Sequence, residues 1–215
     1  MTGPEALDAL MALAGPAAAP ARSPGTRRRL NVPAPQLDAL VGQWRAALDV
    51  PGRVALAHAL WETGVHEAAI AAAKLLTQAR MRPDDAAWAL IADWVPGLDD
   101  PVLADHAARA GARRLVADPA RLDQVAAWLD HPTPLTRRAA LDMTLPWARL
   151  NHPKPADLAI RDRILGWCAQ LARDGDAQPR QAVNGWLRIL AKHDAAQARA
   201  WTATHGPATL GPTVP

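Results

Sequence analysis

The sequence lacks tyrosine and phenylalanine altogether and contains one cysteine. That single cysteine, Cys168, excludes an internal disulfide and a zinc site built from paired cysteines. No apolar run reaches the roughly 18 residues that a membrane-spanning helix requires. The apolar N-terminus is interrupted by Glu5 and Asp8 and follows no basic residue, so it does not have the pattern of a signal peptide. We therefore expect a soluble, cytoplasmic protein that does not bind membranes.

The apolar half of the chain consists mostly of alanine and leucine, and all nine aromatic residues are tryptophan. This composition favours helices that pack closely through small residues. No long stretch alternates apolar and polar residues with the period of a β-strand, so an all-α fold is expected. Seven tryptophans fall at helical positions where a large side chain would fill the core: Trp44, Trp61, Trp88, Trp94, Trp128, Trp147 and Trp167.

Proline and glycine divide the chain into segments with helical periodicity. Helices are expected at 4–14, 35–48, 51–63, 65–80, 84–95, 101–117, 119–130, 134–149, 155–174, 178–192 and 194–205. From Pro51 onward the helices form pairs whose first members begin near Pro51, Asp84, Pro119 and Pro155, at spacings of 33, 35 and 36 residues by subtraction. Such a near-constant spacing predicts helical hairpins stacked into a solenoid with a concave binding face.

We expect three regions along the chain. Residues 1–33 form a short helix and a flexible arm rich in proline and arginine, residues 34–206 form the repeat domain, and residues 207–215 form a disordered tail. The run Arg27–Arg29 in the arm is either a solvated tail or an arm that contacts DNA.

The formal charge of +3 comes from 24 basic residues, nearly all arginine, and 21 acidic ones. Arginine suits phosphate contact, although codon bias alone could produce the excess. The motifs of nucleotide-binding loops, dinucleotide folds and serine hydrolases are absent. The pair His66-Glu67 lacks the second histidine of a zinc helix, so we expect no metal and no cofactor. Asp105 and His106 are adjacent in sequence, which points their side chains about 100° apart on a helix.

Four segments, in order along the chain, resemble the AlkD-like DNA alkylation repair glycosylases. These segments are Leu60–Glu67, with a Trp before a His-Glu pair; Asp84–His106, which ends in Asp105; Trp128–Ala140; and Gln181–Lys192. The resemblance implies a right-handed superhelical solenoid of HEAT-like helical hairpins. It also implies a monomer that binds alkylated double-stranded DNA and hydrolyses the N-glycosidic bond of cationic alkylpurines such as 3-methyladenine and 7-methylguanine, without a metal.

By the same resemblance, Asp105 is the catalytic carboxylate that stabilises the developing sugar cation and orients water. The segment around Arg137 and Arg138 carries the DNA contact, which maps to Arg138. Trp186 and Arg188 lie in Gln181–Lys192, which is similar to the family's segment that carries a second active-site tryptophan before a Leu-Arg pair. We therefore include Arg137, Arg138, Trp186 and Arg188 in the expected nucleic-acid-binding set.

The chain departs from the family where the family has aromatic residues. Pro101 stands one helical turn before Asp105, Leu135 stands three residues before Arg138, and Gly185 takes the position of the second active-site tryptophan, which leaves Trp186 one residue late. These departures keep two alternatives open beside an active glycosylase. One is a DNA-binding relative without catalysis, and the other is a helical-repeat scaffold that binds protein.

Overall fold

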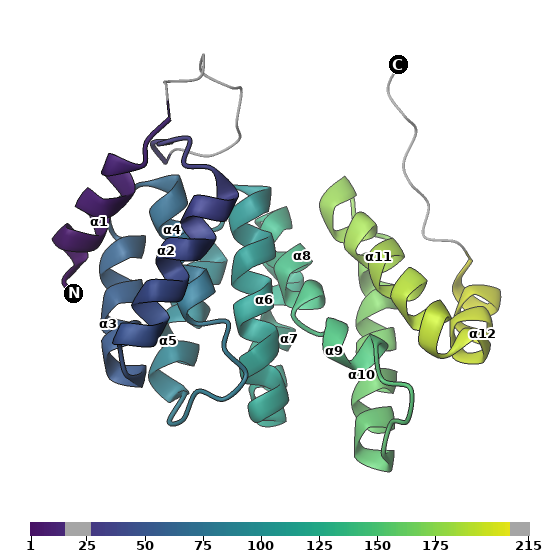
Figure 1. Ribbon diagram of the computed structural model, residues 1–215. Coiled ribbons are helices and arrows are strands. Elements are labelled where there is room, and N and C mark those ends of the chain that lie inside the picture. Colours follow the sequence, from purple (N-terminus) through teal and green to yellow (C-terminus); the bar gives the residue numbers. More distant parts are fainter. Residues whose placement is uncertain (16–26, 207–215) are drawn as a thin grey trace. The chain divides into compact units, whose positions relative to one another are not determined.

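The computed structural model describes residues 1–15 and 27–206, and these residues form two compact units, Met1–Ala117 and Asp118–Pro215 (Figure 1). The described residues contain helices and one isolated parallel bridge, between Arg28 and Val65, but no strand. The all-α prediction is confirmed. Within the described ranges, no helix is both long enough and apolar enough to cross a membrane. The expected tail 207–215 and residues 16–26 of the expected arm lie outside these ranges.

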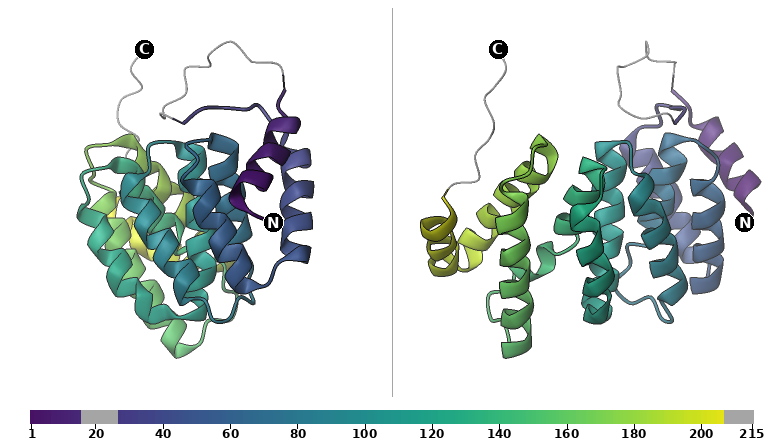
Figure 2. Two further views of the ribbon diagram at one scale, coloured as in Figure 1. Left: turned by 90° about the vertical axis from the view of Figure 1, so that its left-hand side faces the viewer. Right: turned by 180° about the vertical axis from the view of Figure 1, so that it is seen from behind.

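The first unit is built from two layers of helices. It contains α1 (Gly3–Ala12), α2 (Ala34–Ala47), α3 (Val50–Trp61), α4 (His66–Leu75), α5 (Asp85–Trp94), the short 3₁₀ turn η1 (Val95–Gly97) and α6 (Pro101–Ala117). Helices α2, α4 and α6 pack side by side in one layer, and α1, α3 and α5 form the other (Figures 1 and 2). Each pair α3–α4 and α5–α6 is a helical hairpin that joins the two layers.

The second unit contains shorter elements at its start and longer helices after them. In order, they are η2 (Pro119–Arg121), α7 (Leu122–Ala126), η3 (Ala127–Asp130), α8 (Pro134–Asp142), α9 (Leu145–Ala148), α10 (Pro155–Leu171), α11 (Ala177–His193) and α12 (Ala195–His205). Helix α11 is central, because it packs against α8, α9, α10 and α12.

The helices begin close to where the sequence predicts, because the starting residues are helix-initiating types. Proline stands in the first turn of most of these helices, where its missing N–H costs nothing. Asp49 accepts a hydrogen bond from the Gly52 N–H at the start of α3, and Asp194 accepts one from the Gln197 N–H at the start of α12.

Three predicted helices are shorter or divided. The segment 134–149 breaks into α8 and α9 because Pro146 lacks the N–H that a continuous helix needs. The segment 119–130 is divided into η2, α7 and η3, with 3₁₀ turns at both ends of one α-helical piece. Helix α4 ends at Leu75 rather than at residue 80, and the following loop is held instead by Arg114, which donates to the carbonyl oxygens of Gln78 and Met81.

All nine tryptophans are buried, which confirms the seven core predictions and adds Trp186 and Trp201. Alanines fill much of the space between them. In α4 and directly after it, seven small or aliphatic residues have no exposed surface: Ala68, Ala69, Ala71, Ala72, Ala73, Leu75 and Leu76. Two fully buried arginines also belong to the core. Arg114 pairs with Asp84 at 3.0 Å, and Arg161 donates to the carbonyl oxygens of Trp147 and Leu150 and pairs with Asp194 at 3.2 Å.

Candidate nucleic-acid interface and carboxylate site

Asp105 lies half-buried in the second turn of α6, in the first unit. The start of this helix is fixed by Asp100, whose Oδ1 accepts hydrogen bonds from the N–H groups of Val102 at 2.8 Å and Leu103 at 3.2 Å. Pro101 is the first residue of α6, the position at which proline is favoured. Pro101 therefore starts the helix, and no aromatic ring stands one turn before Asp105.

The exposed side of α6 combines charge and apolar surface. This side carries Asp105, Arg109 and Val116, which are separated by about one and two helical turns. Arg109 and Val116 are exposed. The neighbouring His106 is held neutral: burial, followed by the positive charges of Lys74 and Arg109, lowers the pKa of its imidazole to about 4. Lys74 of α4 forms an ion pair with Asp38 of α2. Helix α6 therefore presents one carboxylate, Asp105, next in sequence to a neutral imidazole, and the other carboxylate of this layer that is not buried, Asp38, is paired with Lys74.

The segment Arg27–Val32, which we call the strap, is bound to the first unit by its backbone. The Arg28 N–H donates to the Gly64 carbonyl and the His66 N–H donates to the Arg28 carbonyl, both at 2.9 Å. The buried carboxylate of Glu67 accepts from the N–H groups of Leu30 and Asn31 at 2.9 and 2.8 Å. The arginine run, expected within a flexible arm, is thus bound by its backbone to the start of α4.

The strap also reaches the start of α6. Arg29 pairs with Oδ2 of the buried Asp100 at 2.8 Å, and Nδ1 of His66 lies 3.7 Å from the same oxygen. Burial lowers the pKa of His66, and although Asp100 opposes this effect, Arg29 adds to it. Four residues of the first unit, Arg29, His66, Glu67 and Asp100, thereby join the strap, α4 and α6 into one polar cluster.

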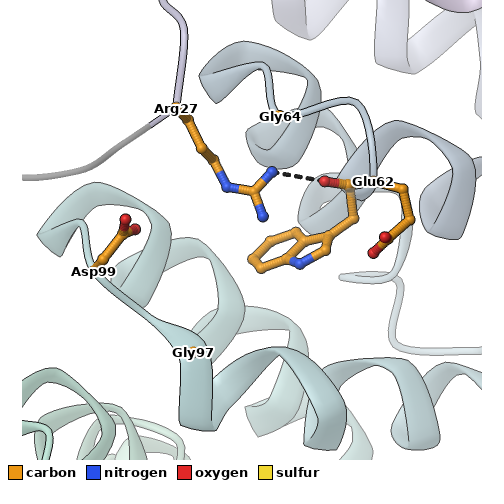
Figure 3. A pocket seen from close by; sticks show the side chains of 6 residues that line it. Arg27, Glu62, Gly64, Gly97 and Asp99 are labelled. Atoms are coloured by element: carbon orange, nitrogen blue, oxygen red, sulfur yellow. Dashed lines mark hydrogen bonds between the residues drawn. The ribbon is translucent and has the colours of Figure 1, made fainter.

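A cavity of about 310 Å³ opens beside the strap, lined by Arg27, Trp61, Glu62, Gly64, Gly97 and Asp99 (Figure 3). The Arg27 guanidinium lies 4.6 Å from the centre of the Trp61 ring and donates to the Trp61 carbonyl at 2.6 Å. The other face of Trp61 stacks on Trp94, with ring centres 4.1 Å apart. Both faces of this indole are therefore occupied by the protein itself.

Arg137 and Arg138 lie on α8, in the second unit, and have different surroundings. Arg137 binds Asp174 through two hydrogen bonds of 2.7 and 2.8 Å, binds Asp176 at 2.7 Å and donates to the His131 carbonyl at 2.6 Å. These partners raise the pKa of Arg137, chiefly through the hydrogen bond with Asp174. The Arg137 guanidinium therefore holds the loop before α11. The sequence predicted a DNA contact for Arg137 and not this structural role.

Arg138 is less enclosed by the protein. It contacts Asp142 at 3.2 Å and Oε1 of Gln178 at 2.7 Å, and its side chain is partly exposed. Gln178 begins the exposed stripe of α11, which continues through Gln181, Gly185 and Arg188 within an arc of about 80°. Arg138 and Arg188 thus lie along one exposed side of the second unit.

The Trp186 side chain does not face this side. Its indole has no exposed surface, and the ring N–H donates to Oγ1 of Thr144 at 3.1 Å in the core. The rotation of about 100° between neighbouring helix positions explains the difference, because it turns Trp186 inward while Gly185 remains half-exposed. A Cβ atom at Gly185 would meet nothing within 4 Å, so the position of the missing aromatic is open.

A model of the DNA alkylation repair enzyme family matches residues 8–214. The chain belongs to this family. Comparisons with curated proteins and with solved structures gave no match. As a family member, this DNA alkylation repair protein has DNA as its substrate class. Among its described residues, no group of three or more histidine, cysteine or acidic side chains could hold a metal ion.

The sequence predicts the helices that carry Asp105, Arg138 and Arg188, but it gives no sign of the polar cluster at the start of α6. Asp100 could have been found, since an aspartate directly before a proline is a helix-start signal. Its partner Arg29 could not, because nothing local links residues 71 positions apart.

Proposed function

We propose that the protein is a monofunctional DNA glycosylase that hydrolyses the N-glycosidic bond of cationic alkylpurines in duplex DNA. The observation that carries the proposal is the half-buried carboxylate of Asp105 on α6, in a chain of the DNA alkylation repair family. We further propose that the enzyme acts as a cytoplasmic monomer and that its helical hairpins follow the right-handed, HEAT-like arrangement expected from the repeat spacing.

One carboxylate is sufficient for this chemistry. A purine alkylated at N3 or N7 carries a positive charge and leaves as a neutral base, so no acid has to protonate it. Positive charge then develops on the sugar, where the Asp105 carboxylate stabilises it electrostatically. The same carboxylate orients the water that adds to the sugar carbon and accepts its proton.

The basic residues of the second unit would position the DNA backbone. Arg138 and Arg188 are the candidates, because both lie along the side described above and Arg188 is exposed. Such contacts fix the register of the duplex without reading its sequence. Arg137 would act indirectly, by holding the loop that precedes α11.

A second candidate function is DNA binding without catalysis. The observation that favours it is the loss of aromatic walls: Pro101 starts α6, Gly185 leaves its surface open and Trp186 is enclosed in the core. An indole beside a cationic base contributes about 0.5–2 kcal/mol of attraction. A site without such walls holds the altered base more weakly.

The deciding experiment measures release of free 3-methyladenine and 7-methylguanine from methylated duplex DNA. The protein should release these bases, and Asp105→Asn should reduce the rate at least a hundredfold while leaving DNA affinity unchanged, because the amide keeps the shape but not the charge. Asp93→Asn, at an exposed position of α5, serves as the matched control and should keep the full rate. Intact DNA binding with no release by the unmodified protein would support the second candidate instead.

A further inference from the structure

A groove of about 460 Å³ runs between α11 and α12 in the second unit. Its walls are Leu187, Arg188, Ala191, Ala195, Ala198, Arg199, Thr202 and Ala203. Most of these side chains are small, and among the lining residues that the structure describes the two arginines are the only charged ones. Arg188 and Arg199 come from neighbouring helices and are both exposed.

These two arginines differ from most others in the second unit. Within its described residues, five arginines have a carboxylate partner at 2.7–3.5 Å: Arg121, Arg137, Arg138, Arg161 and Arg163. No carboxylate partner is seen for Arg188 or Arg199 in the part of the chain that the structure describes. Positive charge is therefore neutralised at these five arginines, whereas the two arginines of the groove keep theirs.

The surroundings of the groove reinforce its positive charge. Helix α11 contains no acidic residue, and Lys192 lies exposed one turn beyond Arg188. The nearest acid in sequence, Asp194, is already used: it pairs with Arg161 at 3.2 Å and accepts from the Gln197 N–H at 3.0 Å. An anion entering the groove would thus meet two guanidinium groups with little competing negative charge.

We propose that Arg188 and Arg199 together hold one phosphodiester group of the DNA backbone, an assignment that rests on the proposed function in binding DNA. Planar guanidinium groups match the oxygens of a phosphate and remain charged at any physiological pH. A docked protein would instead need exposed apolar area. The large exposed hydrophobic residues of the described chain are Met1, Met11, Val102, Val116 and Leu158, and none of them lines this groove.

The test compares the salt dependence of binding to a fluorescent duplex oligonucleotide. The unmodified chain, Arg188→Gln, Arg199→Gln and the double variant are measured over a range of salt concentrations. Loss of one phosphate contact reduces the magnitude of the log–log slope by about 0.9. We expect this reduction in the double variant and smaller, similar reductions in the single variants. Arg173→Gln is the matched control, because Arg173 is also exposed but lies outside the groove.

Each outcome separates this assignment from the proposed chemistry. A reduced slope in the double variant supports the subsite, even if the protein releases no alkylated base. A double variant with the slope of the unmodified chain overturns it while leaving DNA binding intact. Absence of DNA binding in the unmodified chain removes both proposals. Binding of polyglutamate that depends on both arginines, without such dependence for duplex DNA, would instead assign the groove to an acidic protein partner.

Discussion

The guanidinium of Arg29 lies 2.8 Å from Oδ2 of Asp100, although the two residues are 71 positions apart in the chain. The other carboxylate oxygen of Asp100 accepts the first N–H groups of α6. One buried side chain thereby attaches the strap and sets the start of the helix that carries Asp105. The two tasks leave each oxygen of Asp100 with a partner.

Replacement of Asp100 by asparagine should lower the free energy of unfolding by about 2–3 kcal/mol, because it removes the buried negative charge that pairs with Arg29, although the amide oxygen can still cap α6. Denaturation by urea, followed by circular dichroism, measures the change. Asp8→Asn, on the exposed surface of α1, is the control and should change stability by less than about 0.5 kcal/mol. Equal stability of the two variants would contradict the structural role of Asp100.

The Trp186→Phe variant should be destabilised by about 1–3 kcal/mol, since it loses the hydrogen bond to Thr144 and leaves part of a filled space empty. Its affinity for DNA at a temperature where it remains folded should equal that of the unmodified chain. Chemical denaturation and a binding titration supply the two measurements. A large loss of DNA affinity with unchanged stability would return Trp186 to the interface.

Restoring a side chain at Gly185 should be tolerated. Gly185→Ala should raise stability by about 0.5–1 kcal/mol, because glycine inside a helix is unfavourable and the added Cβ meets nothing within 4 Å. Denaturation by urea compares Gly185→Ala with the unmodified chain. A less stable Gly185→Ala would mean that the added methyl group is not accommodated where the structure has open space.

The imidazole of His106 should remain uncharged until the pH falls to about 4, because burial and the charges of Lys74 and Arg109 disfavour its protonated form. The unfolded chain takes up this proton near the ordinary histidine pKa of about 6.5. The contribution of the neutral His106 to the free energy of unfolding is therefore complete above about pH 6.5 and is lost as the pH falls from about 6.5 to 4. Histidine NMR titration checks the pKa directly.

The His106→Gln variant should lose less stability over the same pH interval. His152→Gln, at an exposed position, should keep the full pH dependence and serves as the control. Identical curves for His106→Gln and the unmodified chain would mean that other groups cause the acid sensitivity.

Much of the fold could be predicted because its signals are local. Proline and aspartate mark the starts of α3, α6 and α10, and apolar spacing marks the buried faces. The end of α4 was missed, since the loop after it is stabilised by Arg114, more than 30 positions away. The strap was missed for the same reason: its partners Glu67 and Asp100 are distant in sequence.

The sequence predicts which helices carry the candidate site residues, but not which way each side chain points. The sequence placed Asp105 on α6, but a shift of one residue decides whether a tryptophan on α11 points outward or inward. The inward orientation of Trp186 is fixed by its contact with Thr144 in the core. The spacing of residues in an alanine-rich helix does not predict that contact. Our expectation that Arg137 contacts DNA likewise did not anticipate its bonds to Asp174 and Asp176.

The burial of every tryptophan has a practical consequence for spectroscopy. Because the chain has no tyrosine and all nine indoles are shielded from water, its near-ultraviolet absorption and emission arise wholly from the interior. The folded protein should emit at short wavelength, and unfolding should shift the emission strongly to the red. A duplex that binds the exterior would leave this signal nearly unchanged, so intrinsic fluorescence will report melting of the core while a labelled oligonucleotide is needed to report binding.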